Sequence, residues 1–260
     1  MMIQGFPVID EDTSRLHFGA TGYEGRDTSA YPRSSLKCCK EGDGQRYPKS
    51  SYEAMIAAKT AAKSWIRDKL DRCGLPVKDQ MNSNYCWGHA PVRGVEAAIA
   101  KQGGKLESLS AFDVCTAIKD GRNHGGSGIE AVEWIAENGV CLEKYHKPMD
   151  FSVGRSAEAR EDAMRRQIVV YEDMDPDDKD LIIAKLLDDK AVTVGIPAWG
   201  HEVLLTFLVW ENAEPLFGFD NSWGRTWGTN GRGVLRGRMS NFDEAGSIED
   251  RKSTRLNSSH

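Results

Sequence analysis

The sequence has no excess of positive charge, no long apolar run and no Cys-x-x-Cys motif. Its 260 residues include 34 lysines and arginines against 39 acidic residues, a formal net charge of −5. Nucleic-acid-binding domains usually carry a basic surface, so this balance argues against a nucleic-acid partner. The longest apolar stretches, such as Val203 to Trp210, are far shorter than the roughly 20 residues that cross a bilayer. The first residues also lack the pattern of a secretory signal, so we expect no membrane association.

The six cysteines form no recognisable metal-binding or disulfide pattern. Cys86-x-x-His89 could supply half of a zinc site, but the sequence offers no second half. We therefore predict reduced thiols, most of them buried as small apolar side chains, and no metal or other cofactor. A cytoplasmic or other intracellular location is expected. The cysteines are Cys38, Cys39, Cys73, Cys86, Cys115 and Cys141.

Composition divides the chain into three parts. Residues 1–48 are rich in Gly, Asp, Ser and Arg with little periodicity, which predicts an irregular N-terminal arm. In residues 49–249, helical patterns precede strand patterns, which predicts an α+β domain with a helical lobe at about 77–150 and a β-rich lobe at about 165–249. Residues 250–260 resemble one reading frame of a sequencing adapter, with a natural polar tail as the alternative, and are excluded from this argument.

Apolar periodicity and capping residues predict the helices, and β-branched or aromatic runs predict the strands. A first helix should start at Ser50, with Glu53 completing a capping box, and continue to Gly74. A charged surface helix should have Asp175 as its N-cap. That helix is expected at 176–189, the other helices at about 86–101, 110–120, 129–137 and 156–166, and the strands at 191–197, 202–210, 215–221 and 231–236.

Three separated segments carry the strongest chemical signal. Cys86 starts a predicted helix, His201 lies in Gly-His-Glu-Val, and Asn221 begins Asn-Ser-Trp-Gly. A thiol is a good nucleophile only as a thiolate, and a helix N-terminus alone contributes about 0.3–2 kcal/mol towards the anion. A pKa shift of several units therefore also needs a protonated His201 beside Cys86. Asn221 would orient the imidazole, as the third member of a catalytic triad does.

Two further side chains fit the same chemistry. The amide of Gln80, six residues before Cys86, could join the Cys86 backbone N–H in an oxyanion hole. Trp223 could cover the contact between His201 and Asn221 and exclude water. Together these residues predict hydrolysis of a peptide or amide bond through a thioester intermediate.

These residues and their order resemble the papain family of cysteine peptidases over about residues 77–233. The resemblance implies a two-lobed α+β fold, in which a central helix bearing Cys86 packs against a β-barrel-like lobe. It also implies Gln80 as oxyanion donor, Cys86 as nucleophile, His201 as base and Asn221 as orienter. The glycines 125 and 126 would line the cleft, where any side chain would obstruct pairing with the substrate backbone. The matching segments are Val77-Lys78-Asp79-Gln80, Cys86-Trp87, Leu109-Ser110, Asn123-His124-Gly125-Gly126, Asn138-Gly139, Gly200-His201-Glu202-Val203 and Asn221-Ser222-Trp223-Gly224.

The sequence departs from the family pattern in several places. Ser83 and Asn123 stand where the family has a disulfide-bonded cysteine pair, which a reducing compartment would permit. No long inhibitory prosegment is apparent, so control by a zymogen is in doubt. Tyr85 is bulkier than the family norm and is expected to narrow the cleft, whereas His89 is expected to be a packing residue.

The expected partner is a peptide or protein substrate, and no oligomeric state is predicted. Two alternatives stay open. One is a binding or structural protein that keeps the fold without turnover. The other is a transferase or ligase that uses the same Cys-His-Asn site but passes the acyl group to an amine.

Overall fold

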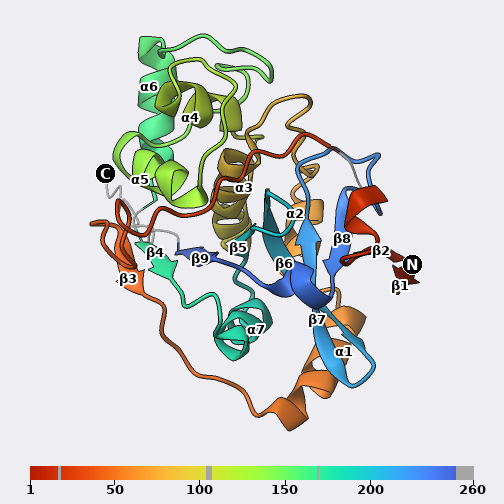
Figure 1. Ribbon diagram of the computed structural model, residues 1–260. Coiled ribbons are helices and arrows are strands. Elements are labelled where there is room, and N and C mark those ends of the chain that lie inside the picture. Colours follow the sequence, from red (N-terminus) through yellow and green to blue (C-terminus); the bar gives the residue numbers. More distant parts are fainter. Residues whose placement is uncertain (17–18, 104–106, 169, 250–260) are drawn as a thin grey trace.

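The computed structural model describes residues 1–16, 19–103, 107–168 and 170–249 (Figure 1). The possible adapter-derived segment, residues 250–260, lies outside these ranges. Seven α-helices are found in the described residues: α1 Tyr52–Ala61, α2 Ile66–Arg72, α3 Cys86–Lys101, α4 Ala111–Ile118, α5 Gly128–Asn138, α6 Ala157–Ala163 and α7 Lys179–Leu187. None of these helices is both long enough and apolar enough to cross a lipid bilayer.

The strands of the described residues form one sheet in the order β1-β2-β8-β7-β6-β5-β9-β4-β3. Most neighbours are antiparallel, but β2 with β8 and β3 with β4 are parallel. The strands are β1 Met2–Ile3, β2 Phe6–Ile9, β3 Cys39–Glu41, β4 Val170–Asp173, β5 Val192–Ile196, β6 His201–Glu211, β7 Glu214–Asp220, β8 Arg232–Leu235 and β9 Glu244–Glu249.

Two apolar cores correspond to two lobes, and α3 lies between them (Figure 1). One core gathers side chains of α3, α4 and α5, including Trp87 and Phe112. The other fills the space between the central strands, α1 and α7, and includes Leu186 and Phe207. Because α3 packs against α5 on one side and β6 on the other, its first residue lies where the lobes meet.

The β6–β7 hairpin explains how residues 201 and 221 come together. Residues 203–210 of β6 are apolar apart from Thr206, and residues 201–209 are buried. Its antiparallel register with β7 pairs Leu204 with Asp220. The residue after β7, Asn221, therefore lies beside the first residues of β6, next to His201.

Most of the predicted elements are confirmed. Helix α3 has the expected bounds, and α5 begins one residue before the expected start. Ser110 caps α4, its hydroxyl oxygen accepting from the Asp113 N–H at 3.1 Å. The four predicted strands correspond to β5, β6, β7 and β8.

The predicted first helix is wrong in detail. It is broken into α1 and α2 at Lys63, whose φ is +48°, a left-handed conformation that a helix cannot contain. Ser50 lies in a short 3₁₀ turn rather than at an N-cap. The carboxylate of Asp68 accepts from the Trp65 N–H at 2.9 Å and so starts a second helix. The apolar stripe is common to both pieces, which is why periodicity alone joined them.

The prediction for α7 also needs correction. Its N-cap is Asp178, which accepts from the Leu181 N–H at 2.9 Å, whereas the carboxylate of Asp175 accepts from Asp177 in the preceding turn. Residues 181–187 are all buried, so α7 is a core helix and not a surface one. Its charged residues are concentrated at its ends, which misled the prediction.

The N-terminal arm is more ordered than its composition predicts. β2 pairs with β8 (Val8 opposite Val234), and β3 pairs with β4 (Cys39 opposite Tyr171). Between these strands the arm crosses in front of α3, as the red ribbon in Figure 1 shows. Strands of two to four residues are too short to show the alternation that identifies a strand in a sequence.

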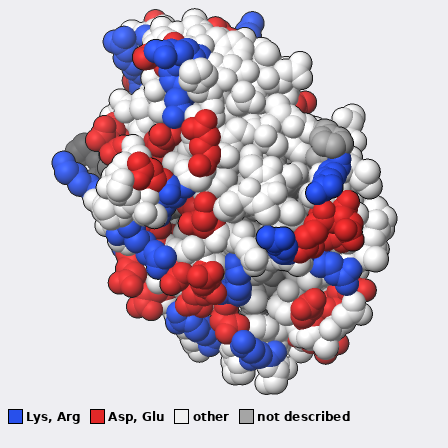
Figure 2. Space-filling model, in the orientation of Figure 1, with Lys and Arg blue, Asp and Glu red and all other residues white. Residues whose placement is uncertain are grey.

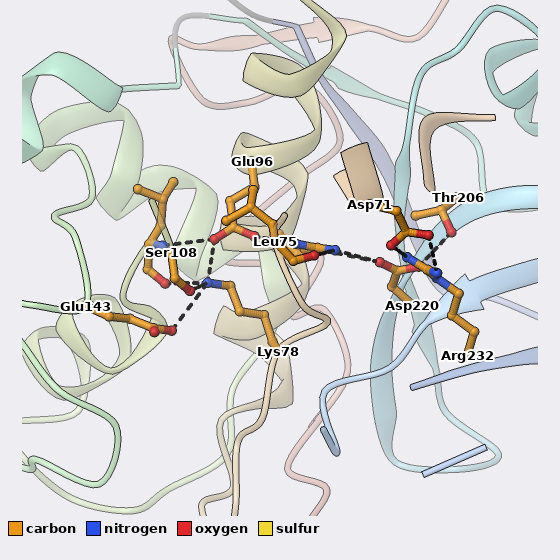
Figure 3. A network of polar contacts seen from close by, with 11 residues as sticks. Asp71, Leu75, Lys78, Glu96, Ser108, Glu143, Thr206, Asp220 and Arg232 are labelled. Carbon is orange, nitrogen blue, oxygen red and sulfur yellow. Dashed lines mark hydrogen bonds and ion pairs between the residues drawn. The ribbon is translucent and has the colours of Figure 1, made fainter. Parts of the chain in front are cut away.

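Charged side chains of both signs are intermixed over the face shown in Figure 2, with a broad uncharged area near its centre. A network of charges, most of them buried, links α3 to the sheet (Figure 3). Arg93 of α3 bonds Glu96 at 2.8 Å and Asp220 of β7 at 3.1 Å. Arg232 joins Asp220 to Asp71, each at 2.8 Å, and Lys78 contacts Glu96. These bonds connect α2 and α3 to β7 and β8.

Candidate active site

Cys86 is the first residue of α3 and has no exposed surface. Burial raises the pKa of its thiol well above the ordinary value, although the backbone N–H groups of Glu202, Trp87 and Tyr23 act in the opposite direction. The helix N-terminus predicted from the sequence is therefore present, but the buried thiol is neutral in this state.

His201 and Asn221 form the predicted pair. The His201 Nε2 atom lies 2.7 Å from the Asn221 Oδ1 atom, and that oxygen also accepts from the Ser222 N–H. An amide oxygen can only accept, so Nε2 carries the proton and Nδ1 has the lone pair. Burial lowers the pKa of His201 to about 4, and the bond to Asn221 opposes the shift. The imidazole is thus neutral and oriented.

The thiolate–imidazolium pair expected from the sequence is not formed here. The N–H of Glu202, the residue after His201, is near enough to lower the pKa of Cys86, so Cys86 and His201 belong to adjoining parts of one site. Within the described residues, however, the His201 Nδ1 atom has no hydrogen-bond partner. Burial disfavours both charged forms, which explains the difference from the expectation.

Two tryptophans enclose the imidazole. The Trp223 ring centroid lies 4.7 Å from that of His201 at an interplanar angle of 31°, and Trp199 packs edge-on at 4.9 Å. Trp223 thus covers His201 as the sequence predicted, and its indole N–H has a further contact with the arm.

The amide of Gln80 is held by both lobes. Its backbone N–H donates to the Ser222 carbonyl at 2.7 Å, and its side-chain oxygen accepts from the Ser222 hydroxyl. Its Nε2 atom donates to the carbonyls of Ser83 and Ala20, at 2.7 and 2.8 Å. The Ala20 carbonyl also accepts from Trp223 Nε1 at 2.7 Å. Gln80 and Trp223 therefore both donate to the same peptide oxygen of the arm. Ser222 positions the side chain of Gln80, a role that the sequence did not reveal.

The arm occupies the cleft next to Cys86. The Gly126 N–H donates to the Gly22 carbonyl at 2.9 Å, and the Glu24 N–H donates to the Gly126 carbonyl at 3.0 Å. The N–H groups of Gly22 and Tyr23 both donate to the Gly200 carbonyl. The pairing with Gly126 is parallel. The backbone pairing expected of Gly126 is thus made, but with the chain's own N-terminal segment.

Close approach explains the glycines along this contact. A Cβ atom on Gly125 would lie 2.5 Å from the Gly22 carbonyl oxygen. Similarly, a Cβ on Gly19 would lie 2.3 Å from the Trp223 ring, and one on Gly22 would lie 2.1 Å from the Asn84 carbonyl. The sequence indicated no long inhibitory segment, and the structure places residues 19–24 of the arm beside the buried thiol. The glycines at 19 and 22 were the available signal.

Tyr85 and His89 both point into the helical lobe. The Tyr85 hydroxyl donates to the Arg122 carbonyl at 2.8 Å, and its ring packs on Phe112. It therefore does not narrow the cleft, contrary to expectation. His89 Nδ1 lies 2.8 Å from the Tyr85 carbonyl, and burial lowers its pKa to about 4. His89 is a neutral packing residue, as predicted.

The positions of the family disulfide are joined by hydrogen bonds instead. The Asn123 Oδ1 atom accepts from the Asn84 N–H at 2.6 Å, and its Nδ2 atom donates to the Asn82 carbonyl at 3.3 Å. Asn123 thus connects the loop before the Gly-Gly pair to the segment around Ser83. None of the six cysteines, all of which lie in the described ranges, forms a disulfide.

Comparison with known proteins gives consistent matches. A family model described as papain family cysteine protease matches residues 61–205. Cysteine proteinase 3 of Dictyostelium discoideum is 28% identical over 180 residues, which cover 60% of this chain and 53% of that protein. Human cathepsin O is 27% identical over 184 residues, with coverages of 60% and 55%. The chain thus spans about half the length of the curated relatives it matches.

Solved structures show the same fold. Digestive procathepsin L 3 from the larval midgut of Tenebrio molitor superposes with a TM-score of 0.58 at 20% identity, covering 67% of this chain and 66% of that one. Xylellain, a cysteine protease from Xylella fastidiosa, gives a TM-score of 0.57 at 18% identity, with coverages of 68% and 84%. These likenesses confirm the two-lobed α+β fold predicted from the sequence.

Proposed function

The chain belongs to the papain family of cysteine proteases, and we propose that it hydrolyses peptide bonds through a thioester formed on Cys86. One observation carries the proposal. His201 is fixed by a 2.7 Å bond to Asn221, and its lone-pair nitrogen is buried and unpaired within the described residues. A buried acceptor without a partner is unfavourable for stability, and a base that must receive the Cys86 proton accounts for it.

The proposed reaction uses residues from both lobes. His201 Nδ1 takes the thiol proton as the Cys86 sulfur attacks the peptide carbonyl carbon. The resulting oxyanion accepts from Gln80 Nε2 and the Cys86 N–H. The imidazolium then protonates the leaving amine, and water hydrolyses the thioester with His201 again as base. Asn221 holds the Nε2–H throughout.

The side-chain amide of Gln80 donates to a peptide carbonyl in this structure. Its Nε2 atom and the Trp223 indole N–H both donate to the Ala20 carbonyl. The segment is peptide backbone, and it reaches the two donors next to Cys86. This contact supports a role for Gln80 in holding the oxygen of a peptide substrate.

Turnover requires the arm to leave the cleft. With the arm in place, burial holds the His201 pKa at about 4 and raises that of Cys86. Water reaching both groups would raise the first and lower the second, which favours transfer of the proton from sulfur to nitrogen. The covered thiol would also suit a family member that binds peptide without turnover, which is the second candidate function.

The test compares peptide cleavage and thiol labelling in the full chain. Cys86→Ala should lower turnover of a peptide library by at least about a thousandfold and abolish labelling by an epoxide electrophile. Cys73→Ala, remote from the site, serves as the matched control and should retain both. Arg26→Ala and Tyr23→Ala, which loosen the arm, should raise turnover.

Three outcomes separate the alternatives. Labelling at another cysteine, or undiminished turnover in Cys86→Ala, would contradict the assignment. Labelled Cys86 without cleavage in the loosened variants would favour the binding protein. An acyl product formed only with an added amine would indicate a transferase.

A further inference from the structure

The side chain of Tyr23 fills a pocket next to the buried thiol. Only 6% of the residue is exposed, and its hydroxyl donates to the Asp243 carboxylate. Its ring lies so close to β5 that a Cβ atom on Gly195 would be 2.1 Å from the phenol oxygen. Glycine at 195 therefore makes room for the ring, and the hydroxyl of Tyr23 is bound by Asp243, itself an exposed residue.

Two more carboxyl groups lie near the ring of Tyr23. Glu202 and Glu244 are each 1% exposed, and none of their carboxyl oxygens has a hydrogen bond of good geometry within the described residues. The N–H groups of Gly128 and Ile129, at the start of α5, are near enough to lower the two pKa values slightly. Burial outweighs them and raises the pKa of Glu244 to about 8. The pocket thus contains acceptors that lack partners.

The arm also brings a cation to these carboxyl groups. Arg26 bonds the buried carboxylate of Asp173 through two nitrogens, at 2.7 and 2.8 Å, and its charge lowers the pKa of Glu244. The arm therefore provides both the phenol that binds Asp243 and the guanidinium that binds Asp173. When the arm leaves, both groups leave with it.

An open pocket of this composition favours one kind of occupant. An apolar side chain would leave the buried carboxyl groups of Glu202 and Glu244 without partners, which is unfavourable. A metal ion is not supported, because no group of three His, Cys, Asp or Glu side chains in the described chain is arranged to hold one. A lysine or arginine side chain supplies three or five donors and a compensating charge.

We propose that this pocket selects peptides carrying lysine or arginine at the position that Tyr23 occupies in the arm. The recognising residues are Asp243, Glu202 and Glu244, with Gly195 providing the space. The inference rests on the proposed peptidase function, but occupancy of the pocket can be tested without turnover.

The first experiment measures how well the arm protects Cys86. Tyr23→Lys and Tyr23→Met have unbranched side chains of similar size that differ mainly in charge. Iodoacetamide labelling of Cys86, followed by peptide mass spectrometry at one pH, reports how often the arm opens. We expect labelling to be at least about tenfold slower in Tyr23→Lys than in Tyr23→Met. Equal or faster labelling of the lysine variant would overturn the proposal.

Two further variants test whether the carboxyl groups cause this difference. Adding Asp243→Asn and Glu244→Gln to each arm variant should remove most of the advantage of lysine over methionine. If the advantage persists, the cation is bound elsewhere and the assignment of the pocket is wrong. Thermal unfolding followed by tryptophan fluorescence verifies that the compared proteins remain folded.

The second experiment uses turnover by the arm-loosened Arg26→Ala chain. Peptides that differ only by Arg, Leu or Glu at the selected position should be cleaved in that order, with kcat/KM at least about tenfold higher for Arg than for Leu. Cleavage that favours Leu would overturn the pocket proposal and leave the peptidase intact. If no peptide is cleaved, the proposed function fails, and the labelling experiment alone decides the pocket.

Discussion

Two pairs of buried acids in this molecule have opposite properties. Glu96 and Asp220 are almost inaccessible, and so are Glu202 and Glu244. Burial would raise the pKa of all four, but Lys78 and Arg93 hold the pKa of Glu96 below its ordinary value, and Arg232 and Arg93 lower that of Asp220 to about 2. The pKa values of Glu202 and Glu244 are raised. Burial alone therefore does not decide whether an acid is charged. The presence of a neighbouring cation decides it.

The location of those cations distinguishes the two pairs. Arg93 and Arg232 belong to α3 and β8, which are integral to the two lobes. Arg26, which acts on Glu244, belongs to the arm, as does Tyr23. The first pair is thus neutralised by cations of the two lobes, which it connects, whereas the second pair lies beside a segment that leaves the cleft in the proposed mechanism.

Removal of a partner from the neutralised pair should have the largest effect. Arg93→Leu leaves Asp220 with one cation fewer and Glu96 with only Lys78. Breaking such a buried pair typically costs about 3–5 kcal/mol of unfolding free energy. Urea denaturation at neutral pH measures the loss, and a decrease below about 1 kcal/mol would show that the network contributes little to joining the lobes.

The dependence of the unfolding free energy on pH should have opposite signs for the two pairs of acids. Folded Glu244 keeps its proton up to about pH 8, whereas the unfolded carboxyl group loses it near its ordinary value. The unfolding free energy should therefore fall as pH rises through this interval, by up to about 1.4 kcal/mol per pH unit for one proton. Glu244→Gln should remove that slope and be more stable than the parent at about pH 8.

Glu96→Gln is the matched substitution in the other pair, and its effect on stability should be the opposite. The lowered pKa of Glu96 means that its carboxylate stabilises the fold above its unfolded pKa, and that this stability is lost as pH falls through the folded value. The substitution should therefore destabilise the protein at neutral pH. If both variants followed the pH dependence of the parent, the comparison between the pairs would fail.

A smaller effect is expected from Tyr23→Phe. This change removes the hydroxyl that donates to Asp243 but keeps the ring in the pocket. The loss of one such bond is worth about 0.5–1.5 kcal/mol, which corresponds to Cys86 labelling up to about tenfold faster. Tyr47→Phe is the control, since its hydroxyl donates to Asp188 in an exposed contact, and labelling of Cys86 should not change.

The smallest effect should come from an ion pair on the surface. Lys144 lies 3.0 Å from Glu107, and both side chains are more than half exposed. Lys144→Met should change the unfolding free energy by less than about 0.5 kcal/mol, because solvent screens such pairs. A loss comparable to that of Arg93→Leu would mean that burial is not what makes the inner network strong.

The sequence predicted those features that depend on local pattern. The stripe of α3 and the apolar run of β6 are long enough for periodicity to be clear, and they place Cys86 and His201 at the ends of elements. The interruption at Lys63 depends on a single backbone conformation that no pattern marks. The N-cap at Asp178 could not be identified from the sequence because several neighbouring aspartates could equally cap the helix.

The state of the site could not be predicted in the same way. Whether Cys86 is a thiolate depends on residues 19–24, which have no periodicity and reach the cleft only through pairing at either side of it. The acidic pocket was missed because Tyr23, Glu202 and Glu244 are remote in sequence. A clue was Glu202, a charged residue directly before the mainly apolar segment 203–210 of β6.

The attachment of the arm at both ends has a kinetic consequence. β2 is paired to β8 on one side of the cleft and β3 to β4 on the other, so a lifted segment remains a closed loop. Such a tethered competitor stays near its site at an effective concentration on the order of millimolar, whatever the dilution of the protein. Return of the arm to the cleft should therefore follow first-order kinetics. An incoming peptide gains lasting access to the cleft only if it binds strongly or if the loop is cut.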